Sequence, residues 1–434
     1  MRPASSLFLI ASWVVIGQGR PTVAQDRPNV ILIIADDLGY GEVECYPNVE
    51  ETPLPTPHID SLARNGVLCT QGYSADPMCW PSRASILTGR YHQRFHRTNP
   101  LPEKERSIAQ YLKPLGYATG CIGKWHNTGS IGAWDLEPIN HPSGWGFDDF
   151  AGFLGGMHDY FDANAGTHFL LGRNRDYYMP VYKGTQPVEQ VGYMTDWITE
   201  QAVQFVRRHG QRSWPFFLYL SYTAIHSPDQ ATEKYLDRNG GDVRRAMLDA
   251  MDCGIGKVLQ TVAEVKQTQN TLVIFVGDNG GYRATSNWKL RGSKGQLFEG
   301  GIRVPFILTW PGHLPRGKKY DHPVMHLDIL PMLLAAVGGK LPHNLDGEDV
   351  LPLLRAGTPT PAHEILFWGR GDRFAVRRGP WKLVQEREPK GAAPTRYLFN
   401  LEKDISEQNN LAGQHRRIVQ ELLESHQQWR TGLR

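Results

Sequence analysis

The 434-residue sequence lacks several features that would assign it to a specialised class of protein. Apart from one short N-terminal segment, no run is apolar enough to suggest a membrane segment. There is no internal repeat and no low-complexity tract. The formal net charge is only +3, which argues against a dedicated nucleic-acid binder but leaves room for a local anion site. We therefore expect a globular protein with no nucleic-acid partner and no membrane span in the mature chain.

Cysteine is scarce. The chain has five cysteines: Cys45, Cys69, Cys79, Cys121 and Cys253. An odd number leaves at least one thiol unpaired in an exported protein, and the sequence does not fix how the others would pair. Their wide spacing contains no C-x-x-C zinc pattern. Free buried thiols are therefore the default expectation for most of them.

The first 24 residues have the pattern of a secretory signal peptide. Arg2 gives a positive start, residues 7–16 are apolar, and the small residues of 22–24 precede a cleavage site. The apolar run is too short to span a membrane, and no cysteine precedes Cys45 to mark a lipoprotein. A buried N-terminal helix is the alternative, but Gly, Pro and Gln follow at once. We expect a mature chain that starts near Gln25 and is secreted or periplasmic.

Three apolar runs, residues 29–35, 215–222 and 271–276, are typical of strands buried on both faces of a parallel sheet. Helical spacing over 193–208 and 242–266 separates them. This alternation predicts an α/β fold with a large, mostly parallel central sheet flanked by helices. A polar cluster follows each run, at the sheet edge where open α/β sheets bind ligands.

The polar clusters hold the first candidate site residues. Asp36-Asp37 follows the first strand, His226 lies just after the second, and Asp278-Asn279 follows the third. Hard oxygen ligands of this kind suit Ca²⁺, or Mg²⁺, and not soft metals. On its own the Asp36-Asp37 pair is equally compatible with a solvated turn, since Asp and Gly are ordinary turn residues.

The second half of the chain predicts a smaller C-terminal unit. A helix that starts near His326 should close the main domain, residues 25–339, and residues 340–360 are typical of a linker. An α+β subdomain of residues 340–434 should follow, with strands near 364–368, 373–378, 381–385 and 396–400 and a helix near 414–430. Residues 127–190 have little periodicity, and we interpret them as loops of a substrate pocket.

The segment from Cys79 to Arg90 reads C-x-P-S-R-x-x-x-L-T-G-R. It resembles the signature of the type I, formylglycine-dependent sulfatases of the alkaline-phosphatase-like superfamily. Other motifs of that family occur in the same order: G-K-W-H at 123–126, G-D-N-G at 277–280, and R-G-x-K-G-x-x-x-E-G-G-x-R-x-P at 291–305. Most relatives have Leu-Gly after the histidine, where this chain has Asn127-Thr128. Several motifs in the right order are far more specific than one.

The resemblance implies a sulfuric ester hydrolase in which Cys79 is not used as a thiol. A formylglycine-generating enzyme would oxidise Cys79 to formylglycine (3-oxoalanine), whose hydrated aldehyde attacks the sulfur. The second hydroxyl of the hydrate then allows sulfate to be eliminated. Residue 79, Asp36, Asp37, Asp278 and Asn279 would bind the cation. A helix predicted from Ser82 would set residue 79 at a helix N-terminus, which favours an anion.

The remaining roles also follow from the resemblance. Arg83 and Lys124 should hold residue 79, and His126 is the expected base for the elimination. His226 and Lys294 should contact the sulfate, and one of them should protonate the leaving oxygen. Lys124 and His158 are further expected substrate contacts, although His158 could equally be a structural histidine. A solvated surface lysine is the competing interpretation of Lys294 taken alone.

Export and the long loop region favour a sulfated polysaccharide or glycosaminoglycan as substrate. Candidate lining residues of sugar subsites are Trp80, Trp134, Trp145, Tyr160, His158 and His168, but aromatic residues are more often part of a core. Two other functions stay open. One is a phosphonate or phosphodiester hydrolase of the same superfamily that uses the same modified cysteine. The other is a catalytically vestigial glycan-binding protein.

Overall fold

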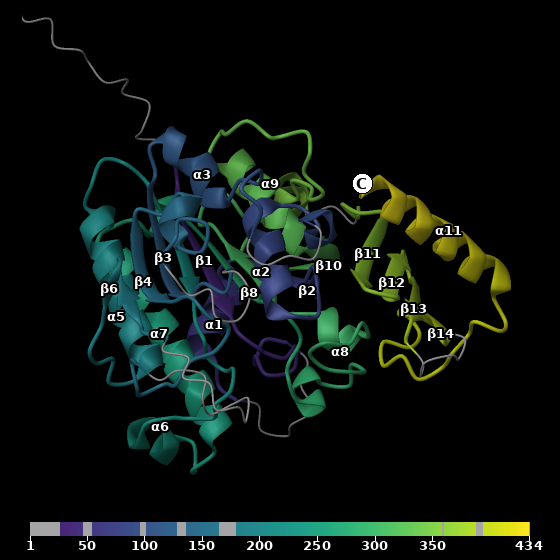
Figure 1. Ribbon diagram of the computed structural model, residues 1–434, viewed down its shortest axis with the longest axis horizontal. Helices are drawn as coiled ribbons and strands as arrows, with labels where there is room; N and C mark the ends of the chain where they lie inside the picture. The colour runs from purple at the N-terminus through teal and green to yellow at the C-terminus, as the bar shows by residue number, and fades with distance from the viewer. Residues whose placement is uncertain are drawn as a thin grey trace, which may run out of the picture.

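The computed structural model describes residues 27–46, 54–95, 101–127, 136–164, 179–357, 360–387 and 394–433. A ten-stranded sheet of order β10-β2-β9-β8-β1-β7-β3-β4-β5-β6 forms the centre, and a four-stranded sheet lies beside it (Figure 1). This confirms the predicted α/β class with a smaller C-terminal sheet. Among the described helices, none combines the length and apolarity that crossing a membrane requires. The predicted signal peptide, Trp134 and His168 lie outside the described residues.

The middle of the large sheet is parallel and carries the three strands that the apolar runs predicted. It consists of β8 (Thr271–Gly277), β1 (Asn29–Ala35), β7 (Phe216–Ser221) and β3 (Ala118–Lys124). Every residue of the first three strands is buried. Strands covered on both faces need apolar side chains on both, which explains their unbroken apolar runs.

Helices cover both faces of the sheet. On one face of the sheet the core includes Ile31 and Ile33. The helices that cover this face are α1 (Pro57–Arg64), α5 (Met194–Gly210), α6 (Glu233–Arg238) and α7 (Val243–Glu264). On the other face the core includes Val30 and Leu32. The helices that cover it are α2 (Cys79–Thr88), α3 (Ile108–Leu112), α9 (Ile329–Ala336) and α10 (Leu351–Ala356). Alternate residues of β1 therefore supply the two cores.

Several short elements were not predicted. The sheet also contains β2 (Val67–Tyr73). The sequence did not predict β4 (Asp149–Phe153), β5 (Tyr182–Lys183), β6 (Gln186–Pro187), β9 (Phe306–Thr309) or β10 (Lys318–Met325). β9 runs antiparallel to β2 and β8. The interpretation of 127–190 as loops is wrong for β4, which pairs in parallel with β3. The expected linker contains α10.

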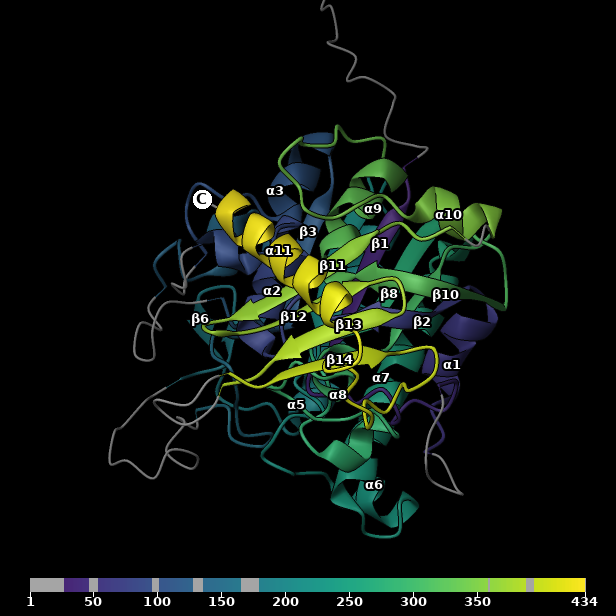
Figure 2. The ribbon, with the colours of Figure 1, turned by 90° about the vertical axis from the view of Figure 1, so that its right-hand side faces the viewer.

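The C-terminal sheet consists of β11 (Ile365–Arg370), β12 (Arg373–Arg378), β13 (Trp381–Gln385) and β14 (Arg396–Asn400). Helix α11 (Arg416–Gly432) crosses it diagonally (Figure 2). Leu383 and Leu398 pack with Leu422 of α11, while their neighbours Val384 and Phe399 pack in a core shared with the main domain. Because side chains alternate between the two faces of a strand, one face of the small sheet packs against α11 and the other against the main domain.

A buried ion cluster joins the two units. Lys382 is 0% exposed and lies 2.9 Å from both Glu299 Oε1 and Glu407 Oε1. Glu299 begins the short helix α8 (Glu299–Ile302) of the main domain. Burial acts to raise its pKa, but Lys382 and Arg303 overcome this and lower the pKa to about 2. Among the cations around Glu299, Lys382 therefore contributes most to keeping Glu299 ionised inside the protein.

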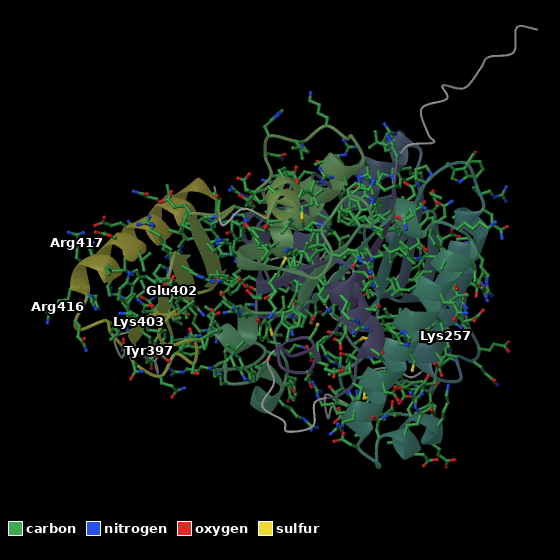
Figure 3. All side chains as sticks on the ribbon, turned by 180° about the vertical axis from the view of Figure 1, so that it is seen from behind. Lys257, Tyr397, Glu402, Lys403, Arg416 and Arg417 are labelled. Carbon is green, nitrogen blue, oxygen red and sulfur yellow. The ribbon has the colours of Figure 1, made fainter. Side chains whose placement is uncertain are left out.

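Replacing Lys382 with methionine is expected to lower the free energy of unfolding by about 3–5 kcal/mol, because two buried carboxyl groups lose their shared cation. Urea unfolding would measure the change. Lys403→Met is the matched control, since Lys403 lies on the surface of the C-terminal unit (Figure 3) and should change stability by less than about 0.5 kcal/mol. A Lys382→Met protein as stable as the control would contradict the argument.

Candidate active site

Four oxygen-bearing side chains meet at the carboxyl ends of β1 and β8. These strands pair in parallel with Ala35 opposite Gly277, so the residues that follow them become neighbours. The Asp37 backbone N–H donates to Asp278 Oδ1 at 3.2 Å, and Asn279 Nδ2 donates to Asp37 Oδ1 at 2.9 Å. Asp36, Asp37, Asp278 and Asn279 are all at most 2% exposed.

Three cations surround these carboxylates. Lys124, at the end of β3, forms an ion pair with Asp36. Arg83 of α2 binds Asp278 Oδ2 through Nε at 2.9 Å, and Lys294 Nζ lies 2.6 Å from Asp37 Oδ1. The surface-lysine interpretation of Lys294 is wrong, because its side chain is only 10% exposed.

Cys79 is the first residue of α2 and lies beside the carboxylates. Its Sγ and carboxylate oxygens of Asp36 and Asp278 all fall within 4.8 Å of one another. The side chain is buried, and burial raises the pKa of the thiol despite the charges of Lys124 and Lys294. A buried thiol of raised pKa is a weak nucleophile, so the unmodified side chain is poorly suited to thiol catalysis.

The donor set fits a divalent cation. Asp36 Oδ1 and Asn279 Oδ1 are buried acceptors without a hydrogen-bond partner in the described part of the chain, and such atoms are costly unless something binds them. Burial acts to raise the pKa of Asp36, but Lys124, His226 and Arg83 together lower it. Carboxylate and amide oxygens held ionised in this way are the ligands of Ca²⁺ and Mg²⁺.

Two of the three predicted histidines adjoin the cluster. His226 Nε2 lies 3.6 Å from Asp37 Oδ2, and its Nδ1 is 2.7 Å from the Ser227 carbonyl oxygen. His126 is half-buried; loss of hydration and then the charge of Lys124 hold its pKa well below the usual range, so the ring is neutral. A Cβ on Gly156 would come within 2.6 Å of His126 Nε2, which explains why glycine stands there.

His158 is placed differently. Its Nδ1 lies 2.8 Å from the Asp159 carbonyl oxygen and its Nε2 2.8 Å from the Met179 carbonyl oxygen. Both ring nitrogens are therefore occupied by backbone, as in a structural histidine. The substrate contact expected of His158 stays a prediction.

The aromatic residues proposed for sugar subsites also differ in position. Trp145 belongs to a core cluster, and the Tyr160 hydroxyl donates to the carbonyl oxygens of Thr223 and His226. Trp80 lines a cavity of about 890 Å³ together with Cys79 and His126. Of the described candidates, Trp80 is thus the one that adjoins the site.

Two residues around the site were missed. Ser221 ends β7, and its Oγ accepts from Arg83 Nη1 at 2.6 Å. His326 Nδ1 is 2.8 Å from Ser82 Oγ, and its Nε2 is 2.9 Å from the Gly277 carbonyl oxygen. His326 thereby joins the start of α2 to the end of β8. The strand-end position of Ser221 was a usable signal, but nothing in the spacing connects His326 to Ser82.

Comparisons with known proteins agree with this geometry. A family model described as Sulfatase matches residues 28–339, and one described as N-sulphoglucosamine sulphohydrolase, C-terminal, matches residues 293–431. Human arylsulfatase D is 31% identical over 438 residues, covering 81% of this chain and 72% of that protein. The N-acetylgalactosamine-6-O-sulfatase of Bacteroides thetaiotaomicron is 29% identical, covering 92% of each. The crystal structure of Ps i-CgsB in complex with k-i-k-neocarrahexaose superposes with a TM-score of 0.82 at 32% identity, covering 93% of each chain.

Proposed function

Because this chain belongs to the sulfatase family, we propose that it hydrolyses sulfate monoesters on a sulfated polysaccharide or glycosaminoglycan. The observation that carries the proposal is the meeting of Cys79, three carboxylates and three cations in one buried cluster. A relative named for N-acetylgalactosamine 6-O-sulfate and a structural neighbour bound to neocarrahexaose support a carbohydrate substrate.

We assign the cation, Ca²⁺ or Mg²⁺, to Asp36, Asp37, Asp278 and Asn279. Bound there, it would offset the negative charge of the sulfate ester and of the attacking oxygen. Burial and the charge of Asp36 raise the pKa of Asp278 even though Arg83 opposes them. A bound cation would act together with Arg83 to keep Asp278 ionised.

We assign the nucleophile to residue 79 after conversion of Cys79 to formylglycine by a formylglycine-generating enzyme. The hydrated aldehyde supplies an oxygen nucleophile that a buried thiol does not. Arg83 is anchored by Asp278 and Ser221, and its fixed positive charge helps to neutralise the site. Lys124, the last residue of β3, forms an ion pair with Asp36 and is assigned to hold residue 79 together with Arg83.

Proton transfer is assigned to the two histidines and Lys294. The Ser227 carbonyl oxygen near His226 Nδ1 orients that ring and leaves Nε2 on the side of Asp37. Lys294 contacts the same carboxylate, so these two donors are placed to bind the sulfate and to protonate the leaving oxygen. Neutral His126 can accept a proton during release of sulfate.

We further propose that residues 1–24 direct export to the periplasm or the outside of the cell. Residues 25–339 then form the catalytic domain and residues 340–434 the C-terminal subdomain. The small sheet, which begins at Ile365, supports a separate C-terminal unit, whereas α10 within residues 340–434 packs in the core of the large sheet. The loop around Asn127 is the place where this chain departs from the family motif.

The proposal predicts that protein made together with a formylglycine-generating enzyme turns over 4-nitrophenyl sulfate faster than bis(4-nitrophenyl) phosphate or a phenyl phosphonate. Intact mass of the peptide with residue 79 should show a species about 18 Da lighter than cysteine. Faster cleavage of the phosphorus esters would favour the phosphonate or phosphodiester alternative. A wholly unmodified thiol without turnover would favour the vestigial glycan-binding protein.

A further inference from the structure

The cavity of about 890 Å³ that contains Cys79 and His126 extends well beyond them. Its far wall belongs to the C-terminal unit. It includes the turn between β11 and β12 with the strand ends that flank it (residues 369–373), together with Glu386, Arg387 and residues of the last turns of α11: His426, Trp429 and Arg430. Figure 2 shows α11 lying diagonally across the small sheet. The cavity is therefore larger than a single sulfate group requires.

The β11–β12 turn is fixed relative to residue 79. Gln93 Nε2 donates to the Gly369 carbonyl oxygen at 2.8 Å. Arg370 Nη1 lies 3.8 Å from Asp76 Oδ1, and the same Oδ1 accepts from the backbone N–H of Met78 at 2.9 Å. One buried carboxylate thus lies between Arg370 and the residue that precedes Cys79, and together with the Gln93 hydrogen bond this places the turn beside residue 79.

Four arginines line the far wall, and two of them have carboxylate partners there. Arg373 lies 3.8 Å from Glu386 Oε2, and Arg387 lies 3.4 Å from Asp372 Oδ2.

Arg370 and Arg430 are the other two arginines of the far wall, and neither forms an ion pair with a carboxylate of that wall in the described part of the chain. The Arg370 side chain is 40% exposed, against 27% for Arg373, and like Arg373 it lies 3.8 Å from its nearest ion-pair partner, here Asp76, which is beyond hydrogen-bond length. No ion pair joins Arg430 to a carboxylate within the described parts of the chain. Arg430 is exposed on α11 and also lines the cavity. Both guanidinium groups thus keep donors free for a ligand.

We propose that Arg370 and Arg430 form a second anion subsite. It would bind a sulfate or carboxylate on the sugar next to the one that loses its sulfate. A guanidinium group matches either anion through two parallel N–H···O bonds. This inference rests on the proposed function and narrows it: the preferred substrate is an oligosaccharide with at least two anionic groups.

The test uses three oligosaccharides that share one reactive sulfated sugar. The neighbouring sugar is neutral in the first, sulfated in the second and a uronic acid in the third, and 4-nitrophenyl sulfate serves as reference. We expect wild-type kcat/KM to be at least about tenfold higher for the second or third than for the first. Comparing the second with the third identifies the anion.

In Arg370→Gln, Arg430→Gln and the double variant, the ratio of kcat/KM for the doubly anionic to the singly sulfated oligosaccharide should fall by about tenfold per arginine. Arg370→Lys, which keeps the charge but not the planar fork, should keep part of the ratio. Arg417→Gln is the matched control, because Arg417 lies at the opposite end of α11 with its side chain 92% exposed (Figure 3). It should leave the ratio unchanged.

The outcomes separate the two proposals. If wild-type protein turns over neither the aryl sulfate nor any oligosaccharide, the sulfatase proposal fails and the subsite with it. If it turns over the substrates but the ratio is near one, or is kept in the double variant, the subsite is refuted while the sulfatase proposal stands. Unchanged thermal unfolding of the Gln variants would show that a lost ratio does not come from misfolding.

Discussion

Replacing Cys79 with alanine is expected to lower kcat for a sulfate ester by roughly 10³-fold or more, because loss of a covalent nucleophile removes the reaction path itself. The side chain is 5% exposed, and alanine is compatible with the first turn of α2. The fold should therefore remain. Steady-state turnover of 4-nitrophenyl sulfate, with thermal unfolding as a check on folding, measures the effect.

Cys253→Ala is the matched control for this substitution. Cys253 is a partly buried free thiol on α7 that contacts Asp249 and Arg238, away from the cluster. It should keep wild-type turnover and the mass change at residue 79. A Cys79→Ala protein that retains a tenth of the activity or more would show that residue 79 is not the nucleophile, and the roles assigned to its neighbours would fall with it.

The residues assigned to the cation could be placed close together from the sequence because a simple rule brings them to one edge of the sheet. β1 and β8 are apolar on both faces and therefore recognisable, and parallel strands put the residues that follow them at one edge. Asp37 and Asp278 could thus be brought together although 241 positions of the sequence separate them. Cys79 depended on the family motif, since α2 has almost no amphipathic pattern to mark it: nine of its ten residues are buried.

The strands that were not predicted have no clear period-two pattern of apolar residues in the sequence. β9 has only four residues and β5 only two, too few for a periodicity to show. β10 mixes exposed and buried residues around Asp321 and Pro323, a pattern that does not resemble a buried strand. β4 was obscured by its glycine and by the irregular sequence on both sides of it.

The part of the site that comes from the C-terminal unit could not be predicted at all. The alternation of Leu383 with Val384 shows that β13 has two buried faces, but not which element covers each face. The approach of Arg370 and Arg430 to Cys79 depends on that packing. Tertiary contacts of this kind leave no periodic trace in either segment, and the residues that line the far wall appear only in the folded chain.

Metal dependence gives the second large expected effect. Treatment with a chelator should abolish turnover, and added Ca²⁺ or Mg²⁺ should restore it. In Asp36→Asn, kcat should fall by about 10²–10³-fold, because Asp36 belongs to both groups of side chains close enough to share an ion. The loss of its charge also leaves the fully buried Lys124 without its ion-pair partner, so a lower thermal midpoint is expected as well.

A binding measurement separates loss of the metal from loss of stability. A cation that binds only the folded state at one hundred times its Kd stabilises it by about 2.7 kcal/mol, so Ca²⁺ should raise the thermal midpoint of chelator-treated wild-type protein. Asp36→Asn should show little of that rise at the same concentration, whatever its own midpoint. Asp237→Asn, which changes an exposed carboxylate of α6, should show the full rise. If Asp36→Asn responds to Ca²⁺ as the control does, the ion is held elsewhere, and the unpartnered oxygens of Asp36 and Asn279 need another explanation.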